Sequence, residues 1–311
     1  MNHKRSIGIY LRGLAMGAAD VVPGVSGGTV AFITGIYEEL LESIQSVNLA
    51  ALKTLFKQGP LPAWQQINGN FLLLLVLGIL TSIFSLAKII SQLLEQQPLL
   101  VWSFFFGLIL ASSFHMARQL KRWSLPVIIA VAAGIGIALV IAVLKPAELP
   151  ATPIMLFLAG AIAICAMILP GISGSFILLL MGMYAHILAA VKQLDWLVLL
   201  CFVAGCGVGL VSFSRLLAWL FRRFHDLTLA LLTGFLVGSL FLVWPWKHTL
   251  SYYQNSRGES MALVRENVLP GAYETLLGTD SQTLMCLLLA IGGFLIVLIL
   301  EFFGAKLAKN A

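Results

Sequence analysis

The sequence contains little charge. Asp, Glu, Lys and Arg make up 10% of its 311 residues, whereas 60% are hydrophobic and the mean hydropathy is +0.98. Because such a composition cannot cover a surface that faces water, it excludes a soluble protein and predicts an integral membrane protein. The 19 Lys and Arg exceed the 13 Asp and Glu. In a membrane protein this excess marks cytoplasmic loops and does not indicate nucleic-acid binding.

Motifs for metals, cofactors and nucleotides are also missing. The four cysteines lie in apolar runs without C-x-x-C spacing, which argues against a zinc site and a disulfide framework. The sequence has no H-E-x-x-H and no G-x-x-x-x-G-K-[ST], so we expect no metal, no cofactor and no bound nucleotide. Arg12 and Asp20 interrupt the apolar stretch after the basic N-terminus. We therefore expect no cleaved signal peptide.

Long apolar runs dominate the remainder. A helix needs about 20 residues to cross a hydrocarbon core, and six runs reach that length. Tryptophans lie near many of their ends, as in the aromatic belt of a membrane protein. The six predicted spans are 71–94, 99–119, 125–144, 196–220, 227–246 and 282–303.

Two further apolar segments, 7–41 and 151–190, are each interrupted by Pro-Gly-x-Ser-Gly. This element cannot continue a helix. The arms of the first segment are too short to cross a membrane comfortably, so we expect a hairpin that enters and leaves on the same face. For the second segment, a re-entrant hairpin and a pair of full crossings both fit.

The two Pro-Gly elements belong to an internal repeat. Pro23 aligns with Pro170 at an offset of 147, and downstream Gly78 aligns with Gly205 at an offset of 127. We therefore divide the chain into repeats 1–145 and 146–311, which together form one transport domain. Each repeat has one hairpin and three spans, so its three net crossings invert the second repeat. The fold class predicted is an all-α membrane protein with an inverted-topology repeat.

Charge indicates the orientation of the spans. With the N-terminus inside, most Lys and Arg beside the spans fall on the cytoplasmic side. We therefore expect a multi-pass protein of the inner (cytoplasmic) membrane with both termini cytoplasmic. Residues 247–281 then form a long external loop. The sequence leaves open whether the chain forms a homo-oligomer.

Inverted repeats with broken hairpins are typical of transporters. A helix that follows Pro-Gly-x-Ser-Gly presents unpaired N–H groups that attract an anion. The structural alternative is that the Pro-Gly pairs only kink packed helices. The predicted anion ligands are Gly24, Ser26, Gly27, Gly28, Thr29, Gly171, Ser173, Gly174 and Ser175, with Arg118 and Arg215 as countercharges.

Asp20 is the strongest candidate for ion coupling, because a charge inside a membrane segment is costly and usually functional. A proton or sodium ion moving with an anion would offset the anion's cost of moving toward a negative interior. Arg12 lies two turns earlier and is the predicted partner of Asp20. The alternative role of Asp20 is structural, as a partner of Arg12 or as a cap of the following turn.

The segment 18–38, AADVVPGVSGGTVAFITGIYE, with 168–176, ILPGISGSF, resembles a bacterial and archaeal membrane family linked to polyprenyl-phosphate transport. The similarity covers almost the whole chain. It implies a flippase that returns undecaprenyl phosphate from the outer to the inner leaflet for cell-envelope synthesis. The motif residues that carry over are Asp20, Pro23, Gly24, Ser26, Gly27, Gly28, Pro170, Gly171, Ser173 and Gly174.

Two rival functions use similar elements. A secondary transporter of a small anion would use the same paired helix termini but would need no lateral apolar opening. A membrane lipid phosphatase is the second rival, because one such family has Pro-Gly-x-Ser-Arg-Ser. Gly27 and Gly174 occupy the arginine position here. Phosphoryl transfer would then lack its main charge stabiliser, so we expect no enzyme.

Overall fold

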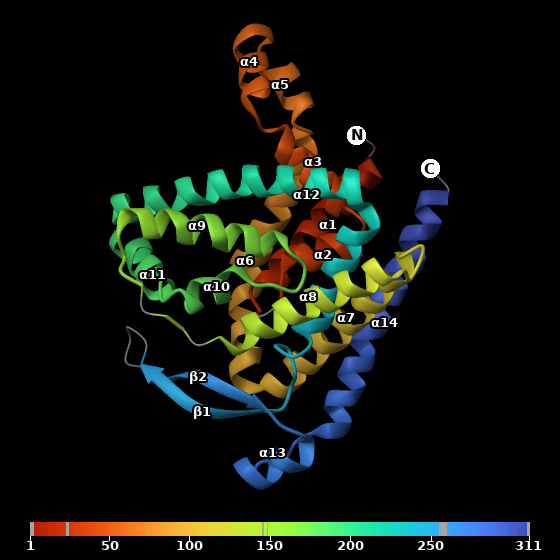
Figure 1. Ribbon diagram of the computed structural model, residues 1–311, viewed down its shortest axis with the longest axis vertical. Helices are drawn as coiled ribbons and strands as arrows, with labels where there is room; N and C mark the ends of the chain where they lie inside the picture. The colour runs from red at the N-terminus through yellow and green to blue at the C-terminus, as the bar shows by residue number, and fades with distance from the viewer. Residues whose placement is uncertain (1–2, 23–24, 145, 148, 255–259, 310–311) are drawn as a thin grey trace.

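The computed structural model describes every residue of the chain except 1–2, 23–24, 145, 148, 255–259 and 310–311. The described part is mostly helical and contains one two-stranded sheet (Figure 1). Its first half has helices α1 (His3–Asp20), α2 (Gly27–Ile33), α3 (Tyr37–Ser46), α4 (Leu49–Gln58), α5 (Pro60–Gln66), α6 (Gly69–Gln96), α7 (Pro98–Gln119) and α8 (Leu125–Val143). Its second half has α9 (Pro153–Ile168), α10 (Gly174–Leu180), α11 (Tyr184–Gln193), α12 (Trp196–Ser239), β1 (Lys247–Gln254), β2 (Ser260–Asn267), α13 (Pro270–Leu277) and α14 (Thr283–Lys309).

A helix lies in each of the six ranges predicted as spans. Among the described helices, α6, α7, α8 and α12 are long and apolar enough to cross a membrane. The pair α10 and α11, bent by 107°, becomes a fifth if it counts as one span. The apolar parts of α9 and α14 are shorter. The prediction of a mostly helical protein with several helices able to span a membrane is confirmed.

The 44-residue helix α12 covers two predicted spans. Its backbone leaves the helical region at Phe224 (φ −137°, ψ 51°), which produces a kink where the sequence indicated a short loop. The prediction that the span 227–246 is helical to residue 246 is wrong, because α12 ends at Ser239. Pro245 has no N–H and restricts the residue before it, so a helix cannot continue through this segment.

The long loop after α12 contains structure that its sequence did not predict. Strands β1 and β2 pair antiparallel. The ammonium of Lys247, the first residue of β1, lies 4.5 Å from the centroid of the Trp102 ring in α7. The same ammonium donates to the carbonyl oxygen of Leu242. Burial lowers the pKa of Lys247 to about 7, and the like charge of Arg265 acts in the same direction. This lysine therefore fixes the start of the β-hairpin to the helical body.

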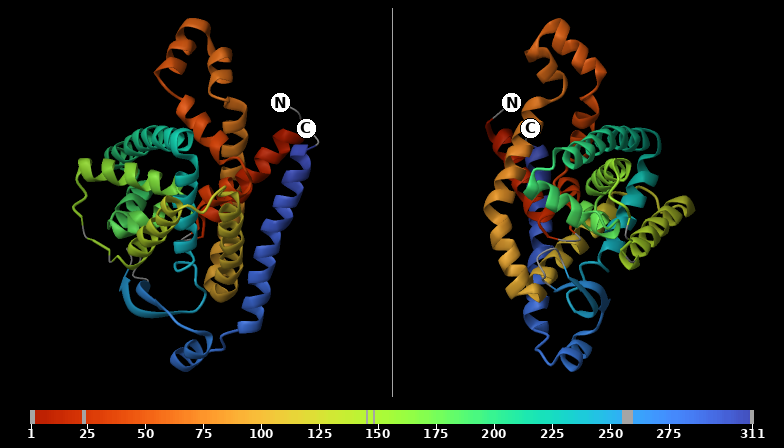
Figure 2. Two further views of the ribbon diagram at one scale, coloured as in Figure 1. Left: turned by 45° about the vertical axis from the view of Figure 1, so that its right-hand side comes forward. Right: turned by 90° about the vertical axis from the view of Figure 1, so that its left-hand side faces the viewer.

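Glycines bring the helices together in pairs. A Cβ atom added at Gly13 of α1 would lie 2.2 Å from the carbonyl oxygen of Leu75 in α6. In the second half, a Cβ at Gly160 of α9 would lie 2.2 Å from the carbonyl oxygen of Phe202 in α12. Such distances require the two backbones to touch, as small residues allow in membrane helices. Figure 2 shows the body built from such helices lying side by side.

The remaining long apolar helices pair across the two halves of the chain. Glycine contacts join α7 to α14, where a Cβ at Gly107 would lie 1.8 Å from the carbonyl oxygen of Ala290. They also join α8 to the second part of α12, where a Cβ at Gly234 would lie 2.2 Å from the carbonyl oxygen of Val131. In each of these two pairs, one helix comes from the first half of the chain and the other comes from the second half.

These contacts predict which glycines tolerate a methyl group. Gly205→Ala should lower the free energy of unfolding by about 1–3 kcal/mol, because its Cβ would lie 1.9 Å from the carbonyl oxygen of Phe157. Gly207 lies in the same helix, and a Cβ added there would meet no atom within 4 Å, so Gly207→Ala is the matched control. Thermal unfolding in detergent measures both variants. Equal unfolding temperatures for Gly205→Ala and Gly207→Ala would contradict this packing.

Candidate functional site

The first Pro-Gly element joins α1 to α2, and its Pro23 and Gly24 lie outside the described residues. Ser26 is the N-cap of α2, and its hydroxyl accepts a hydrogen bond from the N–H of Gly28 at 3.1 Å. The N–H of Gly27 donates to Oδ1 of Asp20 at 2.6 Å. The first amides of α2 are therefore paired within the chain, and a carboxylate already occupies the place predicted for an anion.

The predicted pairing of Arg12 with Asp20 is not formed. No ion pair joins them in the part of the chain that the structure describes. Arg12 interacts electrostatically with Glu39 instead, and Glu39 forms an ion pair with Arg5 at 2.7 Å. The geometry fits the other structural role of Asp20, which is to cap the following helix. Its carboxylate accepts a short, charge-assisted hydrogen bond from the N–H of Gly27.

The second Pro-Gly element joins α9 to α10. Gly171 adopts φ +81°, a left-handed conformation that glycine reaches without strain. Ser173 is the N-cap of α10 but makes no side-chain cap bond. Its buried hydroxyl lies 2.9 Å from the hydroxyl of Ser175, which is exposed. Unlike α2, this helix start has no carboxylate on its first amide among the described contacts.

The structure brings the two Pro-Gly elements together. The hydroxyl of Ser26 donates to the carbonyl oxygen of Met167 at 2.9 Å, and the N–H of Gly171 donates to Oγ1 of Thr29 at 3.0 Å. A Cβ at Gly28 would lie 2.5 Å from the carbonyl oxygen of Ile168. The two hydrogen bonds cross 141 and 142 residues of sequence, so the two elements form one buried junction.

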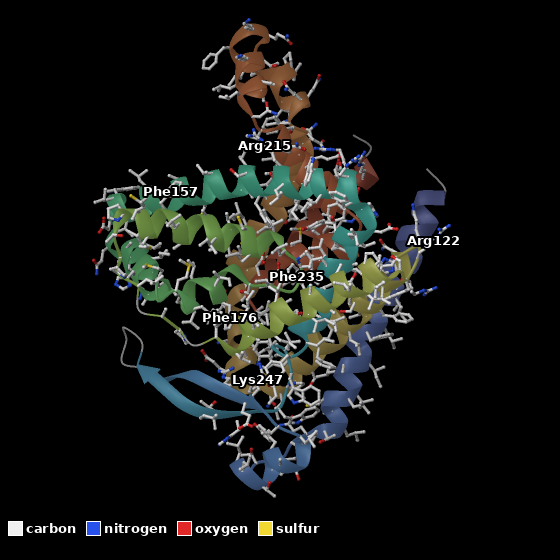
Figure 3. The ribbon with its side chains drawn as sticks, viewed as in Figure 1. Arg122, Phe157, Phe176, Arg215, Phe235 and Lys247 are labelled. Carbon is white, nitrogen blue, oxygen red and sulfur yellow. The ribbon has the colours of Figure 1, made fainter. Side chains whose placement is uncertain are left out.

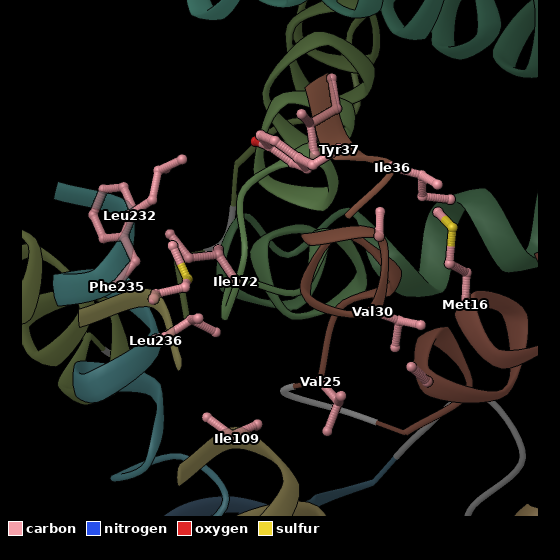
Figure 4. Close-up of a cluster of buried hydrophobic side chains, with 14 of the residues drawn as sticks. Met16, Val25, Val30, Ile36, Tyr37, Ile109, Ile172, Leu232, Phe235 and Leu236 are labelled. Atoms are coloured by element: carbon pink, nitrogen blue, oxygen red, sulfur yellow. The ribbon is translucent and has the colours of Figure 1, made fainter. Parts of the chain in front are cut away.

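Apolar side chains surround this junction. Figure 4 shows Val25 and Val30 of the first element on one side, and Ile172 of the second element beside Phe235 and Leu236 of α12. Burial in an apolar surrounding strengthens the hydrogen bonds of the junction and raises the cost of breaking them. The junction is therefore a hydrogen-bonded contact between the two halves of the chain with an apolar surrounding.

Packing explains the glycines of the junction without a ligand. A Cβ at Gly27 would lie 2.6 Å from Oδ2 of Asp20, and a Cβ at Gly174 would lie 2.6 Å from the carbonyl oxygen of Ala163. Replacing either glycine by leucine would therefore disturb the fold as well as any bound anion. Variants of these glycines do not separate binding from packing, and the serines and Asp20 are better probes.

The predicted countercharges do not reach the junction. Arg118 is exposed near the end of α7, with its guanidinium 5.7 Å from the centroid of the Phe114 ring. Arg215 is exposed on α12 (Figure 3). Neither forms a hydrogen bond or ion pair with the Pro-Gly elements among the described contacts. The sequence could not show this, because a position near the end of a span does not fix the direction of a side chain.

One buried hydroxyl beside these elements was not selected from the sequence. The side chain of Tyr37, at the start of α3, is 2% exposed, and its hydroxyl has no hydrogen-bond partner among the described residues. Its ring packs against Phe32 and Phe221 with centroid distances of 5.2 Å and 6.0 Å. An unpaired buried hydroxyl costs about 1–3 kcal/mol. This group can donate to water or to a ligand that enters the region.

An apolar cavity of about 430 Å³ lies in the bend of α12. Leu169, which directly precedes Pro170, lines the cavity on the side of the second Pro-Gly element. Thr228 is the one polar side chain among the described lining residues, and its hydroxyl donates a hydrogen bond to the carbonyl oxygen of Phe224 at 3.0 Å. The lining residues are Leu169, Phe213, Leu217, Leu220, Phe224, Leu227, Thr228, Leu231, Leu232 and Phe235.

This cavity suits a hydrocarbon chain and not an anion. None of its described lining residues is charged, and the Thr228 hydroxyl is already paired within its own helix. The cavity depends on the kink at Phe224, because the two parts of α12 form two of its sides. The sequence indicates two separate spans here, 196–220 and 227–246, and therefore does not predict the cavity.

Known proteins resemble this chain along most of its length. Residues 16–261 match a family described as undecaprenyl phosphate translocase-like. The chain is 54% identical over 297 residues to a polyprenyl-phosphate transporter of Vibrio cholerae, covering 96% of each chain. It is 33% identical over 258 residues to a polyprenyl-phosphate transporter of Staphylococcus aureus, covering 76% of this chain and 85% of that one. No solved structure matches.

Proposed function

Because the chain belongs to the undecaprenyl phosphate translocase-like family, we propose that it transports polyprenyl phosphate across the inner (cytoplasmic) membrane. The cargo is undecaprenyl phosphate, and the direction is from the outer to the inner leaflet, where cell-envelope synthesis uses this carrier lipid again. The transport is coupled to an ion. The two relatives that support the cargo are both named polyprenyl-phosphate transporters.

The apolar cavity in the bend of α12 is the observation that carries this proposal. A prenyl tail is a hydrocarbon, and the cavity offers it an apolar wall that includes Leu169, next to the second Pro-Gly element. A small water-soluble anion would instead be bound by N–H groups and charged hydrogen-bond donors, which this wall lacks among its described residues. The cavity therefore favours a lipid cargo over the small-anion alternative.

The surroundings of the two glycines disfavour the phosphatase alternative. The position where that enzyme family carries an arginine holds Gly27, whose neighbour is the carboxylate of Asp20. The corresponding Gly174 faces the carbonyl oxygen of Ala163. Both neighbours are oxygen atoms that carry a full or partial negative charge. Neither can stabilise the negative charge that builds up during phosphoryl transfer.

The phosphate head is proposed to bind at the junction of the Pro-Gly elements. In the second element, the proposed ligands lie at the start of α10 and are Ser173, Gly174 and Ser175. The two serine hydroxyls there pair only with each other among the described contacts. The remaining proposed ligands are used within the chain here and become available when the junction rearranges. They are Ser26, Gly27, Gly28, Thr29 and Gly171. Gly24, which lies outside the described residues, is also a proposed ligand.

Asp20 connects the ion to the phosphate in this proposal. Its carboxylate holds the N–H of Gly27, a donor that an incoming phosphate would also use. A carboxylate and a phosphate repel each other, so they cannot share this donor while both are charged. Binding of a proton to Asp20 removes the repulsion and frees the N–H. A sodium ion beside the carboxylate would reduce the repulsion in the same way.

The paired glycine contacts support two inverted repeats, 1–145 and 146–311. The offset of 147 that relates the Pro-Gly elements also relates Gly13 to Gly160, and their partners Leu75 and Phe202 differ by the downstream offset of 127. The two halves thus repeat the same contact between a hairpin arm and the following span. Because α8 and α14 pack across the halves, the repeats interlock, and a change in one shifts the other.

The arrangement of chain ends supports the proposed orientation. Both termini lie on the same side of the body in Figures 1 and 2. Arg122, in the connection after α7, lies toward that side in Figure 3. The positive-inside rule assigns such a side to the cytoplasm. The β-hairpin and α13 then lie outside.

Lipid mass spectrometry of the purified protein tests the proposed cargo. Protein extracted from its membrane in mild detergent should carry a bound polyprenyl phosphate. Added undecaprenyl phosphate should displace this lipid, whereas added inorganic phosphate should not. Exchange by inorganic phosphate at millimolar concentration would instead support the small-anion transporter. Release of free phosphate from added lipid would support the phosphatase.

A further inference from the structure

The helices α4 and α5 form an arm, residues 47–68, that projects from the body (Figures 1 and 2). The two helices pack mainly on each other, and Ala51 and Ala63 are their buried positions. The arm leaves the body on the side where both termini lie. Nothing in the proposed transport path uses it.

The arm exposes large apolar side chains. Phe56 is 81% exposed, Leu49 is 76% exposed and Leu61 is 68% exposed. Leu49, Leu52 and Phe56 recur at the spacing that places them on one face of α4. Trp64 of α5 is also exposed. Contiguous exposed apolar faces of this kind mark a surface that contacts another molecule or a membrane.

Charge identifies the partner. Lys53 and Lys57 are the charged residues of the arm, and it contains no acidic residue. Both lysines are exposed, and Lys53 lies four residues after Leu49 and four before Lys57, so the two follow the edge of the apolar face. A helix with an apolar face flanked by lysines lies at the boundary between lipid headgroups and acyl chains. A flexible lysine stem allows its ammonium to reach the headgroup phosphates.

We propose that the α4–α5 arm, which projects beyond the ends of the membrane helices in Figures 1 and 2, bends toward the membrane and rests on the anionic lipid surface of the cytoplasmic leaflet. Leu49, Leu52 and Phe56 then lie in the acyl boundary and the two lysines lie on lipid phosphates. The body anchors the chain in the same membrane, so the arm needs no separate encounter with lipid. This contact holds the connection between the first Pro-Gly hairpin and α6 at the membrane surface. The proposal does not depend on the cargo.

Depth-dependent fluorescence quenching tests this surface. The background is the full-length protein with its native cysteines replaced, which are Cys165, Cys201, Cys206 and Cys286. Phe56→Cys places a polarity-sensitive fluorophore on the apolar face, and Gln58→Cys places it on the opposite face of the same helix as the matched control. Each labelled protein is reconstituted into phosphatidylcholine vesicles with and without phosphatidylglycerol. A lipid with a spin label on its acyl chain is the quencher.

The fluorophore at Phe56→Cys should be quenched and blue-shifted in the anionic vesicles, whereas that at Gln58→Cys should resemble a fluorophore in water. Two lysines at an anionic surface change the contact equilibrium by about 30-fold, so Lys53→Gln with Lys57→Gln should reduce the quenching. Size-exclusion chromatography verifies that each variant is folded. Equal quenching at both positions would overturn the proposal. A blue shift that disappears on dilution of the protein in lipid would assign the face to a second copy of the chain and would also overturn it.

Discussion

Asp20→Asn should abolish the response of polyprenyl-phosphate transport to an imposed pH gradient. Asparagine keeps the shape of the side chain and can still accept the hydrogen bond from the N–H of Gly27, but it cannot bind and release a proton. Movement of one negative charge toward a negative interior costs about 2.3 kcal/mol at 100 mV, or about 50-fold in the ratio of lipid between leaflets. The Asp20→Asn variant should therefore change the ratio of lipid between the inner and outer leaflets by about 50-fold against inward transport. This ratio is measured in liposomes with a membrane potential.

Asp195→Asn is the matched control for that experiment. Asp195 also caps a helix, accepting from the N–H groups of Leu197 and Val198 at 3.2 Å and 3.3 Å, but it is exposed at the start of α12. Its replacement should leave the pH response unchanged. If Asp20→Asn moved the lipid at the wild-type rate and with the wild-type pH response, Asp20 would be only a helix cap.

Filling the cavity in the bend of α12 should slow transport of the lipid. Leu227 lines this cavity and is 37% exposed, so a larger side chain has space to enter. We expect Leu227→Trp to lower the initial rate about tenfold, which corresponds to a loss of about 1.4 kcal/mol in tail binding. Liposomes that contain undecaprenyl phosphate provide the measurement.

Leu216→Trp is the control for the cavity variant, because Leu216 is 47% exposed on the same helix and does not line the cavity. It should transport at the wild-type rate. Unchanged transport in Leu227→Trp, with a normal unfolding temperature, would mean that the prenyl tail stays in the surrounding lipid throughout the cycle.

Apolar runs and Pro-Gly breaks predicted the helices and their interruptions, because both are local properties of the chain. Span length follows from hydrophobicity, and a helix cannot continue through Pro-Gly. The kink of α12 was not predictable in this way. Its segment of charged residues after Phe221 resembles a loop, and packing on α8 and α9 is needed to hold both parts of one helix around the cavity.

The junction shows the same limit. The sequence selected Ser26 and Thr29 as anion ligands, but it could not show that they bond to Met167 and Gly171 across the two halves. Such pairing depends on tertiary contact. The arm formed by α4 and α5 also depends on tertiary contact, because the two helices bury alanines against each other and leave their larger apolar side chains outside.

Leaflet exchange by the purified protein is the most direct test of the central claim. Liposomes are made with undecaprenyl phosphate in both leaflets and no ion gradient, so that a transporter moves the lipid in both directions. A water-soluble phosphatase added outside removes phosphate only from lipid in the outer leaflet. With the protein present, the reaction should proceed until nearly all of the lipid is hydrolysed, because exchange brings inner-leaflet lipid to the outside. A reaction that stops at the outer-leaflet fraction, as in protein-free liposomes, would contradict the assignment of this chain as a polyprenyl-phosphate transporter.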